Sequence, residues 1–236
     1  MENIISGGAP AVVHGKKSDS VFIFVHGQGG SKDEAQRFAD IADPLGFQVL
    51  AVDLPGHGER TDAEKFVPWE AVPELCAVMR YAKSRWKHIS VRAISIGAWF
   101  SLLAFADETI EKCLLSSPLL DMENMILSMM AFDGVTEERL RNEKEIVGSF
   151  GRTLSWDYLE WARSHPVHAI SRRTDILYAA GDEMIPRETV DRFAAENNCR
   201  LTLYPGGQHW LHTDKELDFM KNWETAAIAK TVNQKT

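Results

Sequence analysis

The chain has 236 residues, of which 44% are hydrophobic and 25% are charged. A chain of this length can bury one sizeable core, and this composition is that of a globular protein rather than a disordered or fibrous one. Its 34 acidic against 26 basic side chains give a net charge of −8, with no basic block. Because such a chain repels polyphosphate, we expect neither nucleic acid nor a membrane surface as a partner.

Three widely separated cysteines, Cys76, Cys113 and Cys199, bear on the compartment. Their odd number and the lack of a Cys-x-x-Cys pair indicate neither a disulfide framework nor a thiolate zinc site. The first residues lack the basic start and apolar stretch of a secretory signal. The longest nearly apolar stretch, residues 93–106, is too short to span a membrane. We therefore expect a soluble cytoplasmic protein.

Short apolar strands alternate with helices along most of the chain. The pattern predicts strands at residues 21–25, 47–52, 88–94, 112–116, 176–180 and 200–204. It predicts helices at residues 33–45, 69–85, 98–106, 187–197 and 214–229. An extra strand is expected around Val12 and Val13. This alternation specifies a mainly parallel sheet with helices on both faces, a doubly wound α/β domain.

One stretch interrupts the alternation. Between the fourth and the fifth predicted strand, residues 118–174 are far more than the dozen or so residues that a simple crossover needs. The stretch contains helix signals and no clear strand. We therefore expect a helical cap at residues 118–174, inserted into a core formed by residues 1–117 and 175–236.

The sequence Ala-Ile-Ser-Ile-Gly at residues 93–97 lies between a predicted buried strand and a predicted helix. A serine there occupies a tight turn that lifts its hydroxyl above the sheet edge, and small residues two positions away on either side let the chains pass closely. Ala93 departs from the usual Gly-x-Ser-x-Gly pattern by one methyl group and is still small. The flanking elements favour a nucleophile over an ordinary serine in a strand-to-helix turn.

With this strand-turn-helix sequence, the chain resembles the α/β-hydrolase family over about residues 21–223. His-Gly-Gln-Gly-Gly at residues 26–30 is similar to the oxyanion loop of the family. Asp-Leu-Pro-Gly-His-Gly at residues 53–58 is similar to an Asp-x-x-Gly-x-Gly turn that is common among its capped members. The resemblance implies the α/β-hydrolase fold.

The resemblance also implies roles for individual residues. The nucleophile is Ser95, the acid is Asp182, which directly follows a late strand, and the base is His209, which follows the last strand. Nucleophile, acid and base occur along the chain in the order that this family uses. The backbone N–H groups of Gln28 and Ile96 would form the oxyanion hole.

Nucleophilic catalysis requires the same residue types for physical reasons. A serine hydroxyl is a weak nucleophile, and the pKa of a histidine lies near the pH at which it must take the proton. A carboxylate behind the imidazole fixes its tautomer and stabilises the imidazolium. Two backbone N–H groups stabilise the oxyanion, each worth about 10²–10³ in rate. Asp121, just beyond the fourth strand, is the alternative acid, because some family members carry theirs there.

A methionine stripe in the insertion bears on the substrate pocket. Its members are spaced by three and four residues and so share one helix face: Met122, Met125, Met129 and Met130, with Ile126 between them. The stripe either packs the cap onto the core or roofs the nucleophile as an adaptable apolar pocket. We assign Met125, Met129, Trp156 and Trp210 to that pocket. Trp156 could instead anchor the cap, and Trp210 could pack under the loop that carries the base.

The remaining histidines and glycines indicate no further site. His165 and His168 are spaced by three, as are His209 and His212, without the His-Glu-x-x-His sequence or nearby cysteines of a metal site. The Gly-x-Gly sequences at residues 27–29 and 56–58 lack the third glycine of a dinucleotide site. We expect His26 to hold its loop by hydrogen bonds rather than to react. We expect no metal and no cofactor.

These residues predict a serine hydrolase that cleaves a small-molecule acyl ester of small or medium size, or a thioester, through an acyl-enzyme. A serine at the elbow, in place of an aspartate, argues against the dehalogenases and epoxide hydrolases of this family. Peptidase, lactonase and carbon–carbon hydrolase activities use the same triad and stay open. Acyl transfer to an alcohol or amine also stays open, as does non-catalytic binding of a small molecule.

Overall fold

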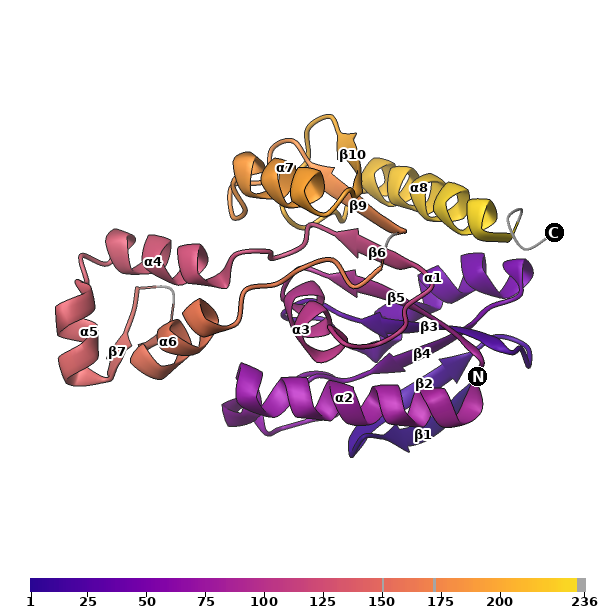
Figure 1. Ribbon diagram of the computed structural model, residues 1–236, viewed down its shortest axis with the longest axis horizontal. Helices are drawn as coiled ribbons and strands as arrows, with labels where there is room; N and C mark the ends of the chain where they lie inside the picture. The colour runs from indigo at the N-terminus through magenta and orange to yellow at the C-terminus, as the bar shows by residue number, and fades with distance from the viewer. Residues whose placement is uncertain (150, 172, 233–236) are drawn as a thin grey trace. The chain divides into compact units, whose positions relative to one another are not determined.

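The computed structural model describes residues 1–149, 151–171 and 173–232, and the chain divides into two compact units (Figure 1). The first unit comprises Met1–Leu119 and His168–Thr236, and the second comprises Leu120–Val167. The second unit is therefore the middle part of the insertion predicted at residues 118–174.

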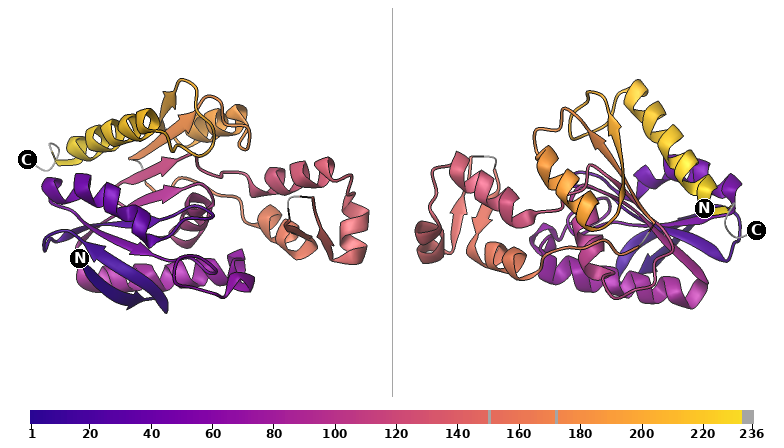
Figure 2. Two further views of the ribbon diagram at one scale, coloured as in Figure 1. Left: turned by 180° about the vertical axis from the view of Figure 1, so that it is seen from behind. Right: turned by 45° about the horizontal axis from the view of Figure 1, so that its top comes forward.

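A central sheet forms the core of the first unit (Figure 2). Within the described residues it has eight strands, in the order β1-β2-β4-β3-β5-β6-β9-β10. From β4 to β10 in this order, neighbouring strands are parallel. The bounds of these strands are β4 Gln48–Val52, β3 Ser20–Val25, β5 His88–Ile94, β6 Cys113–Ser116, β9 Thr174–Ala179 and β10 Arg200–Tyr204. The predicted mainly parallel, doubly wound sheet is confirmed.

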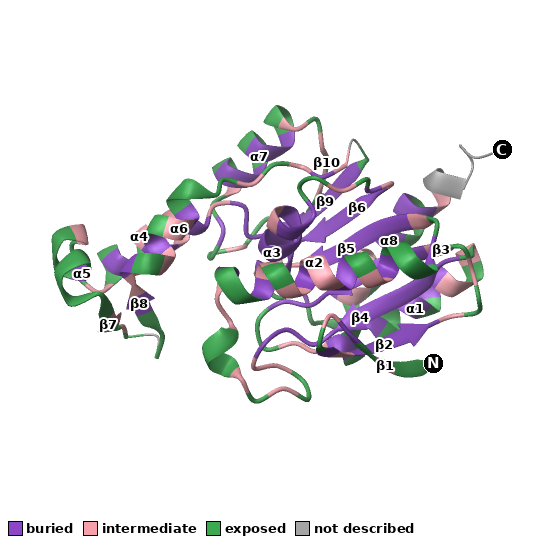
Figure 3. Ribbon diagram, turned by 60° about the horizontal axis from the view of Figure 1, so that its bottom comes forward, coloured by how far each residue is buried: buried purple, intermediate pink, exposed green. Residues whose placement is uncertain are grey.

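Helices cover both faces of this sheet (Figures 1 and 3). Phe22 and Phe24 of β3 point to one face, where they join an apolar cluster with residues of α1 (Ala35–Ala42) and α8 (Asp214–Val232). The alternate residue Ile23 is equally buried on the opposite face, which α2 (Pro68–Arg85) and α3 (Ile96–Ala104) cover. Burial on both faces explains why a strand such as β3 is a continuous apolar run.

The remaining helices of the first unit complete the connections. Short 3-10 helices at Lys32–Glu34 and Asp43–Leu45 flank α1, so the helix predicted at residues 33–45 is built of three consecutive pieces. A third 3-10 helix, Ala63–Lys65, precedes α2. The last crossover uses α7 (Arg187–Glu196), between β9 and β10.

The N-terminal edge holds a strand that was not predicted from the sequence. β1 (Glu2–Ser6) pairs antiparallel with β2 (Ala9–His14), which is the strand expected around Val12 and Val13. The two-residue turn between them is Gly7-Gly8, with φ values of 62° and 90°. Two glycines with positive φ are what a tight hairpin turn requires, so this dipeptide was the available signal.

The second unit contains three helices and a short hairpin in its described residues. The helices are α4 (Met122–Phe132), α5 (Glu137–Glu143) and α6 (Trp156–Ser164), and the hairpin pairs β7 (Glu145–Val147) with β8 (Thr153–Ser155). The hairpin corrects the expectation of an insertion without strands, because three residues per strand are too few for an alternating pattern to stand out. The function of this unit as a cap stays a prediction.

Arg163 of α6 joins the three helices of the second unit. Its guanidinium makes ion pairs with Glu123 of α4 at 2.6 Å and with Glu137 of α5 at 2.7 Å. Leu140 and Leu159 are fully buried inside the same unit. The second unit therefore has an apolar interior and polar links of its own.

Candidate active site

Ser95 occupies the turn from β5 into α3 with φ 51° and ψ −123°. A positive φ is uncommon for a residue other than glycine, so the surrounding structure must hold this turn in place. The backbone N–H of Ser95 donates to the carbonyl of Ser116 at 3.1 Å, and the N–H of Leu119 donates to the carbonyl of Ser95 at 3.1 Å. A side chain at Gly97 would collide with the backbone carbonyl of His26, so only glycine lets the turn pass that strand end.

Ser95, His209 and Asp182, from the ends of β5, β10 and β9, form one chain of hydrogen bonds. Ser95 Oγ lies 2.7 Å from His209 Nε2, and His209 Nδ1 lies 2.7 Å from Asp182 Oδ2. The Asp182 side chain is fully buried, and that of His209 is 14% exposed. Because an ionised carboxylate only accepts, Nδ1 of His209 carries the proton, which leaves Nε2 free to accept the Ser95 hydroxyl.

The turn that carries Asp182 is held by its own hydrogen bonds. Oδ1 of Asp182 accepts from the N–H groups of Met184 at 2.9 Å and Ile185 at 3.0 Å. A side chain at Gly181 would collide with the carbonyl of Gly207, so the loop of the acid and the loop of the base pass in close contact. The alternative acid, Asp121, caps α4 by accepting from the N–H of Asn124 at 3.0 Å.

The glycine-rich loop after β3 lies beside the Ser95 turn. A Cβ atom on Gly27 would be 3.3 Å from the Cβ of Ser95. The next residue, Gln28, is exposed, and Ile96 opens α3 directly after Ser95. Within the described part of the chain, neither the backbone N–H of Gln28 nor that of Ile96 donates a hydrogen bond. Neither group therefore has an acceptor among the described residues.

His26 holds this loop, as expected from the sequence. Its ring is buried, with Nδ1 2.7 Å from the carbonyl of Gly27 and Nε2 accepting from the N–H of Leu54 at 3.0 Å. Burial lowers the pKa of His26 to about 4. The ring is therefore neutral near pH 7 and serves as a hydrogen-bond bridge between the turns after β3 and β4.

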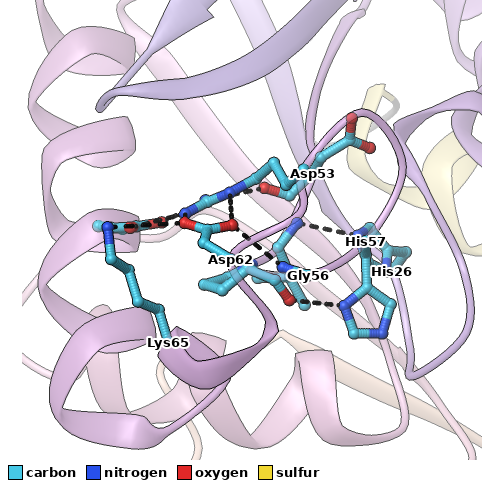
Figure 4. A network of polar contacts seen from close by, with 10 residues as sticks. His26, Asp53, Gly56, His57, Asp62 and Lys65 are labelled. Carbon is cyan, nitrogen blue, oxygen red and sulfur yellow. Dashed lines mark hydrogen bonds and ion pairs between the residues drawn. The ribbon is translucent and has the colours of Figure 1, made fainter.

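The Asp-x-x-Gly-x-Gly turn after β4 carries a polar network (Figure 4). Asp62 accepts from the N–H of Gly56 at 3.3 Å, and Arg60 joins Asp62 at 2.6 Å to Glu74 of α2 at 2.5 Å. Burial would raise the pKa of Asp53, but hydrogen bonds from Lys32 and Glu59 hold it below its ordinary value. Asp53 therefore stays ionised in the interior of the first unit.

Lys32 is a residue of this region that was not singled out from the sequence. Its side chain is only 6% exposed, and its ammonium lies 2.8 Å from the carboxylate of Asp53. A lysine after a glycine-rich loop is usually solvated. The available signal was Asp53 itself, because a buried aspartate requires a partner.

The four residues predicted for the substrate pocket differ in exposure. On α4, Met125 and Met129 are half-buried, whereas Met122 and Met130 of the methionine stripe are buried. Trp156 is 4% exposed, with the guanidinium of Arg141 4.7 Å from its ring within the second unit. Trp210 is 73% exposed and stacks on His212 with 4.6 Å between ring centres. Their contact with a substrate stays a prediction.

Two kinds of feature do not occur among the described residues. No three His, Cys, Asp or Glu side chains gather there as a metal ion would require. No helix in the same part of the chain combines the length and the apolar character needed to cross a bilayer. His165, which lies three residues before His168 in the sequence, stacks on Trp161 with 3.9 Å between ring centres.

Known proteins resemble this chain in sequence and in fold. A sequence profile described as the alpha/beta hydrolase family matches residues 22–220. No curated protein matches the chain. The structure of Est1E from Butyrivibrio proteoclasticus with ferulic acid bound is 21% identical, with a TM-score of 0.80 over 99% of this chain and 100% of that one.

Two further solved structures share the fold at lower identity. Alpha/beta hydrolase domain-containing protein 10 from mouse is 14% identical, with a TM-score of 0.75 over 94% of each chain. A soluble variant of monoglyceride lipase from Saccharomyces cerevisiae, solved with a substrate analogue, is 14% identical, with a TM-score of 0.66 over 98% of this chain and 94% of that one. The likeness extends over nearly the whole length of the chains compared.

Proposed function

The chain belongs to the alpha/beta hydrolase family, and on this premise we propose that it is a serine hydrolase that cleaves a small or medium acyl ester or thioester. The observation that carries the proposal is the hydrogen-bonded chain from Ser95 Oγ through the His209 ring to Asp182, with 2.7 Å at each link. Such a chain supplies a nucleophile, its base and the group that orients the base.

In the proposed reaction, Ser95 Oγ attacks the carbonyl carbon of the substrate while its proton passes to His209 Nε2. The tetrahedral intermediate then expels the alcohol or thiol, which takes that proton, and an acyl-enzyme is left. Water attacks the acyl-enzyme with His209 again as the base, the carboxylic acid leaves, and Ser95 takes the proton back from His209. Asp182 keeps its negative charge throughout and stabilises the imidazolium.

The open N–H groups of Gln28 and Ile96 support a site for the oxyanion. Each preorganised donor of this kind contributes about 10²–10³ in rate. Ile96 also begins α3, and the positive end of a helix dipole favours negative charge there. The backbone, rather than a metal or a cofactor, would then stabilise the developing charge.

An ester is the proposed substrate for two reasons. Among the structures of similar fold, one is named a monoglyceride lipase and was solved with a substrate analogue, and Est1E was solved with ferulic acid. Trp210 directly follows the base in the sequence and exposes an apolar ring that an acyl group could contact. We propose that Trp210, Met125, Met129 and Trp156 contact the acyl group and that the second unit acts as a cap.

The test is hydrolysis of p-nitrophenyl esters of increasing acyl length by wild type and by Ser95→Ala. We expect wild-type turnover with an optimum at a short or medium chain, and a loss on the order of 10⁵-fold or more in Ser95→Ala. Ser101→Ala is the matched control, because that hydroxyl donates to the carbonyl of Gly97 within the same helix. Hydrolysis that survives in Ser95→Ala contradicts the proposed nucleophile.

A further inference from the structure

We propose that Lys32 and Asp53 form a positioning pair that fixes the glycine-rich loop, and with it the backbone N–H of Gln28, at the place where the oxyanion develops. The inference rests on the proposed function and adds a device that aligns one of its two donors. Lys32 would act through the backbone of its own loop and touch no substrate, so it is a positioning residue rather than a catalytic one.

The pair is buried and doubly connected. The Lys32 side chain is 6% exposed and that of Asp53 is fully buried, with 2.8 Å between the ammonium and the carboxylate. The second oxygen of Asp53 accepts from the backbone N–H of Lys32 at 2.8 Å. Asp53 therefore holds both the side chain and the main chain of Lys32.

The glycine-rich loop is tied down at both of its ends. At its start, His26 accepts from the N–H of Leu54, and at its end Lys32 is bound to Asp53. Asp53 and Leu54 are neighbours in the turn after β4, part of which Figure 4 shows with His26 beside it. Two consecutive residues, Asp53 and Leu54, therefore hold the two ends of the loop.

The middle of the loop has little support of its own. Gln28 and Gly29 are exposed, and a Cβ atom added to Gly29 would meet no atom within 4 Å. Within the loop, the N–H of Gly30 donates to the carbonyl of Gly27 at 3.2 Å. Because the tip is exposed, the position of the Gln28 N–H depends on the two anchored ends.

A charged pair suits this task better than an apolar contact. Burying two charges costs about as much free energy as their attraction returns, so the pair adds little stability, but its geometry is specific. Burial alone would lower the pKa of Lys32, but hydrogen bonds and charge from Asp53 and Glu59 raise it. Lys32 therefore remains an ammonium.

The first unit contains a matched control pair. Lys112 and Asp175 are each 3% exposed, with 3.0 Å between their charged groups, and they lie where β6 and β9 begin. Their strands run parallel to β3 and β4, so this pair lies at the opposite edge of the sheet from the glycine-rich loop. After loss of the lysine, each carboxylate keeps further donors, backbone N–H groups for Asp53 and Arg200 for Asp175.

The experiment compares Lys32→Met with Lys112→Met in the full chain. Three quantities are measured: the unfolding midpoint in urea, kcat and KM with a p-nitrophenyl ester, and the inhibition constant of a trifluoromethyl ketone, whose tetrahedral adduct carries an oxyanion. We expect both variants to unfold at lower urea. Only Lys32→Met should lose about 10- to 100-fold in kcat and in affinity for the ketone, with KM changed by less than about twofold.

Several outcomes overturn the proposal. One is an equal loss of kcat in both variants, and another is a loss in Lys32→Met that falls on KM alone. If Lys32→Met does not fold, Lys32→Gln takes its place, because an amide can still donate to Asp53, and an intermediate loss of kcat is then expected. A wild-type protein that neither hydrolyses esters nor reacts with a fluorophosphonate fails the proposed function itself, and the positioning role with it.

Discussion

The parallel sheet uses polar residues differently at the two ends of its strands, which we call the amino edge, where the strands begin, and the carboxyl edge, where they end. At the edge where the strands begin, polar side chains pair with one another: Lys87 with Asp19 at 2.7 Å, and His88 with Glu111. At the edge where the strands end, Ser95 meets His209, and two backbone N–H groups have no acceptor in the described residues. These two pairs are satisfied within the protein, whereas the second edge also contains donors without an acceptor in the described residues.

The difference follows from the topology. In a parallel sheet the turns that leave the strands all open at the carboxyl edge, so residues far apart in sequence meet there. Ser95, Asp182 and His209 each follow a different strand and converge at this edge. Removal of a polar pair at the opposite edge should therefore change the stability of the protein but not its kcat.

The sharpest test of this contrast changes one aspartate at each edge. Asp182→Asn should lower kcat about 10⁴-fold, because its carbonyl would keep the N–H donors of Met184 and Ile185 while its NH₂ donates to His209 Nδ1, which selects the wrong tautomer and stabilises no imidazolium. Asp19→Asn at the amino edge removes a carboxylate with an exposed partner, Lys87, and should leave kcat unchanged. Steady-state kinetics with a p-nitrophenyl ester measures both, and similar losses would refute the contrast.

The next largest effect is expected from packing at the carboxyl edge. Gly97→Ala places a methyl group against the carbonyls of His26 and Val25, which should cost about 1–3 kcal/mol and move the Ser95 turn. Gly27→Ala is the milder comparison, because its Cβ would lie 3.3 Å from that of Ser95. Urea unfolding should rank Gly97→Ala as the less stable of the two, and the reverse order would contradict this account of the elbow.

Acid should destabilise the protein through His26. Its pKa is about 4 in the folded state, against an ordinary value of 6.5 in an unfolded chain. The unfolded state therefore binds the proton first, so the stabilisation is complete above about pH 6.5 and is lost as the pH falls towards 4. The loss amounts to about 3 kcal/mol from this group. Urea unfolding at several pH values measures it.

Substitution of His26 by Asn supplies the control for the acid experiment. His26→Asn should lower stability at pH 7, because the bridge to Leu54 is disturbed, and should flatten the dependence between pH 6.5 and 4. Burial also lowers the pKa of His14, so some dependence should remain. A slope as steep as that of wild type would remove His26 from the explanation.

The smallest effect is expected at Trp210, whose exposed ring follows the base directly in the sequence. Trp210→Ala should raise KM for longer or aromatic acyl esters about threefold, with an unfolding free energy within about 0.5 kcal/mol of wild type. Ile5 of β1 is also exposed, at 66%, but belongs to the N-terminal edge strand. Ile5→Ala should leave KM unchanged, and equal KM values in both variants would exclude Trp210 from the pocket.

Much of the fold was predictable because the central strands of its sheet are buried on both faces. The run at residues 21–25 is apolar throughout and matches β3 closely. β1 escaped prediction because it is an edge strand with only Ile4 and Ile5 as an apolar pair. The β7–β8 hairpin escaped because each strand has three residues.

Some residues of the candidate site could likewise be predicted from the sequence, and others could not. Ser95 was recognisable from local sequence, since an elbow needs small neighbours within five residues. The structure brings Ser95, His209 and Asp182 together, whereas Asp121, the alternative acid, caps a helix. Lys32 was not recognisable, because its burial depends on Asp53, 21 residues further along the chain.

The most direct test of the central claim is to label the folded protein with a fluorophosphonate and map the adduct by tandem mass spectrometry. In this reaction Ser95 Oγ forms a bond to phosphorus and fluoride leaves. We predict one adduct, on the peptide that carries Ser95, and none in Ser95→Ala. An adduct on another residue, or none while a known serine esterase reacts alongside, would contradict the account.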